Sequence, residues 1–452
     1  MHKFGADSER LFFVNSDMPK HRFFYGWVVV AIAFVTMAVA ITARTSFSLL
    51  YPEILSEFRW SHGVTAGSYS VGFIASILLL PIVGLLMERV GPRVVIPLGA
   101  LLVAGGFVMM MSITDPVGLY IAMGILIVNG SMSMSYIVHS MFLPNWFVRN
   151  RGLAVGLAFA GVGVGAIVLL PLIQIVIETE GWRNACLYMA IAIVAVIIPI
   201  NLLFQRNSPA QMGLQPDGDG SQRNGKPQAF HRREVIRNRA WAETEWTVTK
   251  AITTVRFWAM FISMFCGLFV WYGVQAHQTK LLIDEGFSAQ FAAAALGFVA
   301  FFGIFGQVGI GALSDRIGRE LAWTIALAGF GATSIFLIMV LKSQMIIFVY
   351  LAVIVQGLMG NGMAALFGAI TTELFAGKRA ASIVALIGMG GNIGAGVGAW
   401  LLGVLHDQTG SYESGLWVCW GVSILSMICI WIASPSRVRQ MVRVPLATSK
   451  TS

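Results

Sequence analysis

The sequence predicts an all-α membrane protein with twelve transmembrane helices, arranged as two pseudo-symmetric six-helix halves. Three observations lead to this prediction: the hydrophobic composition, the length of the apolar runs and an internal repeat. Of the 452 residues, 57% are hydrophobic and 11% are charged, whereas a soluble globular domain carries about 25% charged residues. A soluble chain of this composition could not cover its surface with polar groups, so we expect it to lie in a membrane.

The apolar residues come in long blocks, each long enough for a helix to cross roughly 30 Å of hydrocarbon. The blocks do not alternate in polarity, as the strands of a membrane β-barrel would. The first block is too long for the core of a signal peptide and is expected to remain as a helix. The predicted spans are residues 25–48, 68–87, 94–113, 117–142, 152–176, 183–204, 256–278, 290–313, 321–341, 344–371, 380–404 and 415–433.

The basic residues are concentrated on one side of this arrangement. If the N-terminus is cytoplasmic, 25 of the 30 lysines and arginines fall in cytoplasmic segments. Positively charged loops stay in the cytoplasm, so both termini are expected inside, in the inner (plasma) membrane of a cell. The net charge of +9 therefore indicates orientation and contact with membrane lipid, not nucleic-acid binding. We expect a monomer.

An internal repeat relates the two halves. Residues 84–93 read Gly-Leu-Leu-Met-Glu-Arg-Val-Gly-Pro-Arg, and residues 311–319 read Gly-Ala-Leu-Ser-Asp-Arg-Ile-Gly-Arg, 227 positions later. A weaker pair, residues 146–151 and 374–379, has an offset of 228. Such repeats indicate halves of the same orientation, related by an axis along the membrane normal. The expected segments are an N-tail (1–24), an N-terminal half (25–204), a central loop (205–255), a C-terminal half (256–433) and a C-tail (434–452).

The central loop is polar and carries two distinct stretches. Residues 207–225 are rich in Pro, Gly, Asp and Asn and are expected to form a flexible linker. Residues 232–250 are basic and contain two tryptophans. This second stretch is compatible with a helix on the membrane surface and equally with a solvated linker.

The repeated loop resembles the hallmark motif of the major facilitator superfamily, Gly-x-x-x-(Asp/Glu)-Arg-x-Gly-x-(Arg/Lys). Its glycines permit a tight turn, and its acids and arginines can pair across neighbouring helix ends to latch one conformation. The alternative role of its arginines is to anchor the loops on the cytoplasmic side. The expected latch residues are Gly84, Glu88, Arg89, Gly91, Arg93, Gly311, Asp315, Arg316, Gly318 and Arg319.

Within that superfamily, the chain is similar to the monocarboxylate transporters and their bacterial relatives, including oxalate–formate exchangers. The motifs that carry this similarity are Tyr-Gly-Trp at residues 25–27, the segment 146–156 that opens the fifth span, and the segment 207–218 of the central loop. The resemblance implies a secondary transporter of small organic anions, by proton symport or anion exchange. It implies alternating access and no cofactor.

Arg44 is the clearest candidate for a substrate ligand, because it is the one basic residue placed well inside a span. A charge inside the membrane is costly and needs a functional or structural reason. Arginine presents a planar, permanently charged fork that suits a carboxylate. The resemblance points the same way, because that family carries a substrate-linked lysine near this position. The alternative is a side chain that reaches the outer interface or pairs with helix-end carbonyls.

Polar side chains on other spans complete the predicted site. In the fourth span, Asn129, Ser133, Tyr136 and Ser140 fall within about 40° of one helix face at 100° per residue. His139 and His277 are candidates for proton coupling, although each is equally compatible with a packing role. The expected substrate-binding residues are Arg44, Asn129, Tyr136, His139, Tyr272, Gln275, Gln307, Gln356 and Asn392.

One departure from the family weakens the expected proton mechanism. In animal monocarboxylate transporters, the eighth span carries an aspartate and, four residues later, an arginine that engage substrate and proton. Alignment on Gly311 puts Gly303 and Gln307 at these positions, so both charges are missing. This leaves a single-arginine site, suited to a monoanion or a larger, partly apolar organic acid.

Other classes of protein are less compatible with the sequence. An exporter of drugs or amphiphiles is consistent with the two missing charges of the eighth span. A sugar transporter is less consistent with the family motifs. A membrane sensor would need an output module, which the central loop and short tails do not offer. The sequence shows no nucleophile–base pair that would indicate an enzyme. The four cysteines fall in predicted spans, and the seven histidines show no metal-ligand spacing, so we expect no metal.

Small residues recur every fourth position on the fifth and eleventh spans. On the fifth, Gly152, Gly156 and Ala160 form one series and Gly161 and Gly165 another, and on the eleventh the series is Gly390, Gly394 and Gly398. This spacing predicts close approach of neighbouring helix backbones.

Overall fold

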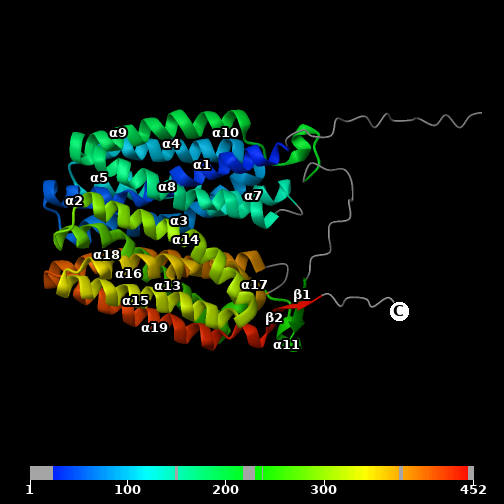
Figure 1. Ribbon diagram of the computed structural model, residues 1–452. Coiled ribbons are helices and arrows are strands. Elements are labelled where there is room, and N and C mark those ends of the chain that lie inside the picture. The colour runs from blue at the N-terminus through cyan, green and yellow to red at the C-terminus, as the bar shows by residue number, and fades with distance from the viewer. Residues whose placement is uncertain (1–23, 148–150, 217–229, 237, 376–379, 446–452) are drawn as a thin grey trace, which may run out of the picture.

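The computed structural model is an all-helical bundle with a small sheet at one end (Figure 1). It describes residues 24–147, 151–216, 230–236, 238–375 and 380–445. The remaining parts of the tails, the central loop and the second repeated motif, including Arg149, Lys378 and Arg379, lie outside the described residues.

The first half of the chain forms one bundle, drawn in blue to green in Figure 1. Its elements are α1 (Gly26–Thr45), α2 (Phe47–Phe58), α3 (His62–Val90), α4 (Pro92–Met110), α5 (Pro116–Leu119), a π-helix (Tyr120–Val128), α6 (Asn129–Met132), α7 (Tyr136–Trp146), α8 (Arg151–Glu180), α9 (Trp182–Ala192), a second π-helix (Ile193–Ile197), α10 (Ile198–Phe204) and a 3-10 turn (Pro209–Met212).

The second half forms the other bundle, drawn mainly in yellow to red. Its elements are β1 (Phe230–Ile236), α11 (Arg239–Ala242), α12 (Val248–Ile252), α13 (Val255–Asp284), α14 (Ala289–Ile317), α15 (Arg319–Ser343), α16 (Ile346–Leu358), a 3-10 turn (Gly360–Gly362), α17 (Met363–Leu374), α18 (Ala380–Thr409), α19 (Glu413–Ala433), a 3-10 turn (Pro435–Arg437) and β2 (Arg439–Pro445).

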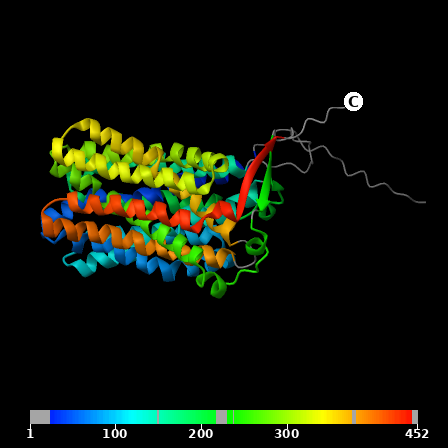
Figure 2. The same cartoon turned by 90° about the horizontal axis from the view of Figure 1, so that it is seen from below.

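The twelve predicted spans correspond to twelve crossings. In the described residues, eleven helices are long and apolar enough to cross a membrane, and a shorter apolar helix over Pro116–Met132 belongs to the remaining crossing. Several helices run beyond the predicted bounds: α3 begins at His62 and α13 ends at Asp284. The described chain enters and leaves at the same end of the bundle, which we call the tail end; the other is the far end (Figures 1 and 2).

The fourth crossing differs from the regular helix that the sequence predicts. It contains a nine-residue π-helix, then α6, and its helical hydrogen bonding is interrupted between Met132 and Tyr136, where Ser135 is extended (φ −98°, ψ −164°). The single polar face expected from a constant 100° per residue is therefore not formed. A π-helix and a break both change the rotation of every later residue about the axis.

The glycines of the fifth and eleventh crossings bring helix backbones into contact, as predicted. A Cβ at Gly165 would lie 2.6 Å from the Cβ of Ala38, and one at Gly394 would lie 2.0 Å from the carbonyl oxygen of Phe265. Ala38 and Phe265 are 227 positions apart, which is the offset of the sequence repeat. The two halves therefore repeat in packing as well as in sequence. Gly156 is an exception, because nothing lies within 4 Å of its Cβ position, and the surroundings of Gly152 lie outside what the structure describes.

The central loop is tied to the second half by a strand and two tryptophans. Strand β1 pairs antiparallel with β2, with Phe230 opposite Pro445, and the two strands lie at the tail end (Figure 2). The indole of Trp241 donates a 2.7 Å hydrogen bond to the carbonyl oxygen of Leu374, and its ring packs on Trp246. The region that was compatible with one surface helix is thus a strand followed by two short helices.

Candidate functional site

Arg44 lies near the end of α1 with its side chain buried between the two halves. The residue is 9% exposed, and its guanidinium lies 5.6 Å from the centroid of the Tyr272 ring on α13. Among the described residues, the guanidinium of Arg44 has no ion-pair or hydrogen-bond partner. Its backbone carbonyl accepts a 2.6 Å hydrogen bond from the hydroxyl of Tyr69 on α3. Arg44 is thus a buried cation whose charge is neutralised by no acidic side chain of the described residues.

Two further predicted residues join this cation. Tyr136, at the start of α7, lies beside Gln307 of α14 and close enough to interact with the charge of Arg44. Tyr272 also lies near Tyr136 and packs against Phe73 with ring centroids 4.4 Å apart. The structure therefore brings together Arg44 and Tyr136 from the first half with Tyr272 and Gln307 from the second. We refer to these four residues as the central cluster.

Two other predicted residues, Asn129 and His139, have structural contacts instead. The amide of Asn129 donates to the carbonyls of Gly72 and Gly124, at 3.3 and 3.0 Å, and so ties the fourth crossing to α3. His139 is fully buried, and its Nδ1 lies 3.0 Å from the carbonyl oxygen of Ser135 in the preceding turn. Neither residue contacts the central cluster through a bond in the described structure.

His277 lies at the far end of α13, away from the central cluster. Its Nε2 lies 2.8 Å from the carbonyl oxygen of Ala399, and its ring packs edge-on against Tyr51 with centroids 5.2 Å apart. The histidine is 1% exposed. Its contacts join helices at the far end, so its position favours packing over direct contact with a substrate at Arg44.

The other predicted amide side chains still have free hydrogen-bonding groups in the described structure. The backbone carbonyl of Gln275 accepts from Ser48, but no described residue binds the side chain of Gln275 or of Asn392. Gln356 on α16 is 1% exposed, and its Oε1 has no hydrogen-bond partner in the described part of the chain. These three side chains therefore have free hydrogen-bonding capacity, although the structure does not place them against the central cluster.

The repeated loop of the second half is a network of charged side chains at the tail end. Arg319, at the start of α15, binds Asp315 at 3.1 Å and Glu373 of α17 at 2.8 Å. It also donates to the hydroxyl of Ser314. Arg319 and Glu373 are only 12% and 11% exposed at their side chains, so the pairing across helix ends predicted from the motif is present here. Arg316 is exposed.

The equivalent loop of the first half does not make this network. Arg93 donates to the backbone carbonyl of Leu202 at 2.6 Å, while Glu88 and Arg89 are exposed and have no polar partner in the described structure. Asn145 occupies the position that corresponds to Glu373 at the repeat offset of 228, and it supplies no negative charge. The turn itself is shared, because Gly91 and Gly318 have φ of +72° and +93°.

The two halves are joined at the far end. The hydroxyl of Ser48 on α2 bonds to the carbonyl of Gln275 at 3.0 Å and to the hydroxyl of Thr279 at 2.9 Å. The carboxylate of Asp407 on α18 accepts from the backbone of His62 and Gly63, both at 2.7 Å. At the tail end, no hydrogen bond or ion pair joins the halves in the described residues. The structure is therefore closed at the far end.

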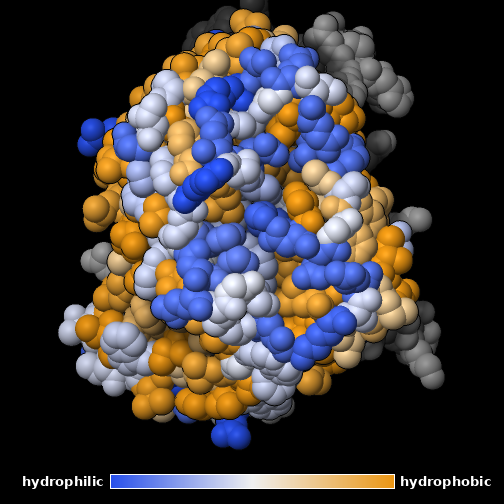
Figure 3. Space-filling model, turned by 90° about the vertical axis from the view of Figure 1, so that its left-hand side faces the viewer, coloured by the Kyte–Doolittle hydropathy of each residue, from blue (hydrophilic) through white to orange (hydrophobic). Residues whose placement is uncertain are grey.

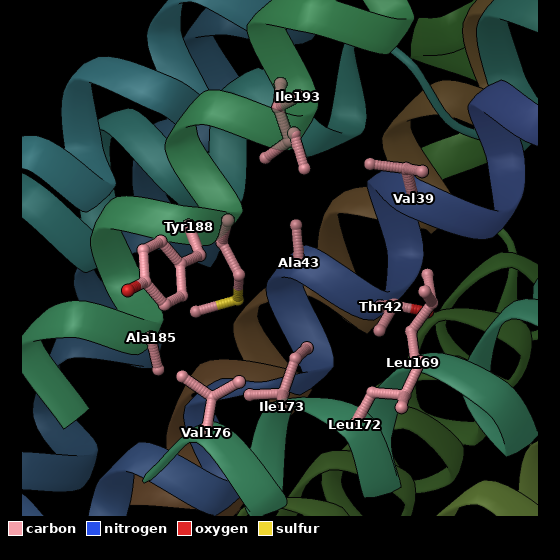
Figure 4. Close-up of a pocket in the computed structure, with 12 residues that line it drawn as sticks. Val39, Thr42, Ala43, Leu169, Leu172, Ile173, Val176, Ala185, Tyr188 and Ile193 are labelled. Carbon is pink, nitrogen blue, oxygen red and sulfur yellow. The ribbon is translucent and has the colours of Figure 1, made fainter. Parts of the chain in front are cut away.

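A separate cavity of about 200 Å³ lies within the first half (Figure 4). Its walls come from α1, α8, α9 and the adjoining π-helix, and no charged side chain lines it. Thr42 and Ala43 contribute to it, whereas the neighbouring Arg44 contacts Tyr272 of the other half. The cavity is thus distinct from the central cluster.

Sequence reasoning missed two groups of residues. Tyr69 binds the backbone of Arg44, and its polar ring inside an apolar span was an available signal. The second group is His62, His406 and Asp407, which each offer a ligand atom within 4.8 Å of the others. Spacing could not reveal this group, because His62 lies more than 340 positions before its partners.

Comparison with known proteins gives a consistent family assignment. The family model described as Major Facilitator Superfamily matches residues 33–352 and 323–449. The chain is 26% identical over 417 residues to human monocarboxylate transporter 11, covering 91% of this chain and 83% of that one. It is 23% identical over 425 residues to rat monocarboxylate transporter 13, covering 91% of this chain and 89% of the relative.

Solved structures share the fold. A bacterial homologue of the human lysosomal transporter Spinster, in an inward-facing and occupied conformation, superimposes with a TM-score of 0.66 at 15% identity, covering 92% of this chain and 98% of that one. The nucleoside transporter NupG superimposes with a TM-score of 0.67 at 13% identity, covering 91% and 100%. At these identities the comparison concerns the fold alone.

Proposed function

Since this chain belongs to the major facilitator superfamily, we propose that it moves a small organic anion, in the first place a monocarboxylate, across the membrane by alternating access. The observation that carries the proposal is the buried and unpaired Arg44 between the two halves. The relatives named as monocarboxylate transporters support the same class of substrate. Transport would proceed as proton symport or anion exchange, in the inner membrane, with both termini cytoplasmic.

Arg44 is suited to hold the carboxylate of the substrate. An unpaired charge inside a membrane protein is costly, and a bound anion removes that cost when it binds. The guanidinium can offer two parallel N–H donors to one carboxylate. Because no second cation lies in the central cluster, one negative charge on the substrate satisfies the site, and a dicarboxylate would bring an unpaired charge into it.

The rest of the central cluster would hold the remainder of the substrate. Tyr272 and Tyr136 each present an aromatic ring and a hydroxyl, and Gln307 presents an amide. Since Arg44 and Tyr136 belong to one half and Tyr272 and Gln307 to the other, relative movement of the halves changes the site. This is the behaviour that alternating access requires of a site at the interface between repeats.

The direction of opening follows from the contacts between the halves. The positive-inside distribution assigns the tail end to the cytoplasm, and the far end carries the hydrogen bonds that join the halves. The described conformation is accordingly closed to the outside. Opening of the far end would break the contacts of Ser48 and Asp407 and would expose Arg44 from the outside.

The experiment is ligand-induced thermal stabilisation of the detergent-purified full chain. The panel contains monocarboxylates, dicarboxylates, aromatic acids, sugars and neutral amphiphiles. A ligand at 100 times its dissociation constant adds about 2.7 kcal/mol to the folded state. We expect monocarboxylates to stabilise the native chain, Arg44→Lys to bind more weakly, and Arg44→Gln to show no response. Arg316→Gln, which removes an exposed arginine outside the site, is the control.

Two results would overturn the proposal. If neutral amphiphiles alone stabilise the native chain, the protein is better described as an exporter of such compounds. If Arg44→Gln responds to carboxylates like the native chain, the arginine is structural and the anion binds elsewhere.

A further inference from the structure

The far end of the bundle holds a compact group of side chains that can ligate a metal ion. His62 lies at the start of α3, and His406 and Asp407 lie in the last turn of α18. Each offers one ligand atom, and the three atoms lie within 4.8 Å of one another. Since α3 belongs to the first half and α18 to the second, the group exists only while the far end is closed.

Two ring nitrogens in this group have no hydrogen-bond partner. They are Nε2 of His62 and Nδ1 of His406, and both are shielded from solvent. The two imidazole rings lie with their centroids 3.9 Å apart. Buried polar atoms are normally satisfied, so two unpartnered nitrogens on neighbouring rings need an explanation. A bound cation that accepts both lone pairs supplies one.

The surrounding contacts hold His62 and Asp407 side by side. The carboxylate of Asp407 lies 3.0 Å from Nδ1 of His62 and accepts from the backbone of His62 and Gly63. The hydroxyl of Tyr51 donates to the backbone carbonyl of His62 at 3.2 Å, which holds the residue from a third element.

We propose that His62, His406 and Asp407 form a zinc site that holds the far end closed. Two imidazoles and a carboxylate suit Zn²⁺, whereas Mg²⁺ and Ca²⁺ prefer oxygen ligands. Tetrahedral zinc places its ligand atoms about 3.3 Å apart, so side-chain rotation must bring the present group closer together. The ion can reach the group because the side chains of His62 and Asp407 are 19% and 25% exposed.

The site lies on the face that the sequence assigns to the outside. Hydrophilic residues run across the middle of this end of the molecule, with hydrophobic residues towards the rim (Figure 3). An ion that binds ligands from both halves binds the closed state better than the open one. It therefore shifts the population towards the closed state by the ratio of the two affinities. External Zn²⁺ is thus an inhibitor of opening.

The first measurement is zinc binding by competition with a chromophoric chelator, on the detergent-purified full chain at constant neutral pH. We expect one strong site, and at least about tenfold weaker binding in His406→Gln and in His62→Gln. His231→Gln, which removes a histidine from strand β1 at the tail end, is the matched control and should bind like the native chain. MgCl₂ should not compete. Equal binding by all four proteins would overturn the site.

The second measurement follows opening directly in liposomes. Ser48 is buried at the far-end contact between the halves, so a Ser48→Cys variant reacts with an external, membrane-impermeant thiol reagent only when that end opens. The four native cysteines are buried, and the native chain gives their background. We expect external ZnCl₂ to slow labelling and EDTA to restore it, with no zinc effect after His406→Gln is added. Zinc binding without slower labelling would overturn the role in closure.

The zinc inference rests on the proposed alternating access but not on the proposed substrate. The two can fail separately. If Ser48→Cys is not labelled even in EDTA, the far end does not open and the alternating-access proposal fails. If it is labelled in EDTA and zinc has no effect, alternating access stands and the zinc proposal fails.

Discussion

The carboxylate of Asp407 accepts a 2.7 Å hydrogen bond from the backbone nitrogen of Gly63, although the two residues belong to opposite halves of the chain. The last turn of α18 in this way supplies an acceptor for the first turn of α3, whose leading N–H groups have no partner within their own helix. A carboxylate at a helix N-terminus also interacts favourably with the helix dipole. This contact is one of those that join the two halves at the far end.

We expect Asp407→Asn to open the far end more often, because a neutral amide keeps one acceptor oxygen and loses the charge. The loss of a charge-assisted bond corresponds to about 1–2 kcal/mol, or a roughly tenfold increase in opening. The measurement is external thiol labelling of Ser48→Cys in EDTA, with and without the second substitution. Asp284→Asn is the control, because Asp284 pairs with Lys280 inside one half. Equal labelling rates would contradict the assigned role of Asp407.

We expect Tyr272→Leu to weaken carboxylate binding, while Tyr272→Phe changes it little. The ring of Tyr272 faces the Arg44 guanidinium, and such a contact is worth about 0.5–2 kcal/mol. Phenylalanine keeps the ring and leucine removes it. Titration of the ligand-induced melting shift gives the dissociation constants. An equally large loss in Tyr272→Phe would instead assign the effect to the hydroxyl group.

We expect Arg319→Gln to lower the free energy of unfolding by about 2–4 kcal/mol. The substitution leaves Asp315 and Glu373 close together without their shared cation, and both acids are largely buried. Arg316→Gln is the matched control, because it removes an exposed arginine three residues away and should cost less than about 0.5 kcal/mol. Thermal unfolding in detergent measures both variants. Similar melting temperatures for the two would show that the network adds no stability.

We expect Gly394→Ala to destabilise the chain by about 1–3 kcal/mol, because the new methyl group would lie 2.0 Å from the carbonyl oxygen of Phe265. Gly156→Ala should be neutral or slightly stabilising, since the methyl group meets no atom within 4 Å and alanine favours helix. Melting temperatures of the two variants provide the comparison. A stable Gly394→Ala chain would mean that α13 and α18 can move apart at little cost.

Much of the fold could be predicted because its causes are local. Long apolar runs determine the crossings, and the repeat with Gly91 and Gly318 determines the two halves and their turns. The break after Met132 could not be predicted, because residues 129–135 carry no proline and read as a continuous helix. Ser131, Ser133 and Ser135 donate to the backbone carbonyls of Val128, Asn129 and Met132, and three such local bonds in one short stretch compete with the helical pattern.

The candidate site was predictable to a lesser extent. Arg44 was identified because a charge in a span is conspicuous in any sequence. Asn129 and His139 are equally conspicuous, yet Nδ2 of Asn129 and Nδ1 of His139 already contact backbone carbonyls, and only Oδ1 of Asn129 and Nε2 of His139 are left without a partner in the described structure. A sequence without an alignment does not reveal whether a buried polar group already has a partner. The far-end group escaped detection for a related reason, since its members meet only when the two halves are assembled.

The departure in the eighth crossing has a packing explanation. A Cβ on Gly303 would lie 2.5 Å from the amide nitrogen of Asn361, and that amide donates to the carbonyl oxygen of Val299. An aspartate at position 303 therefore does not fit this arrangement of α14 and its neighbour. The side chain of Asn361 occupies the space next to position 303, and its amide joins the two crossings through the hydrogen bond to Val299. The absence of an acid at position 303 is consistent with this packing.

The sheet formed by β1 and β2 has a consequence for biosynthesis. About 200 residues separate the two strands, and ribosomes add roughly 5–20 residues per second. During translation, β1 therefore stays without its partner for about 10–40 seconds, while all six helices of the second half are made. A chain that stops before Arg439 leaves this strand with an open edge, which is prone to pair with other chains. The sheet can therefore form only in a chain that has been translated through β2, and a truncated chain carries an unpaired β1.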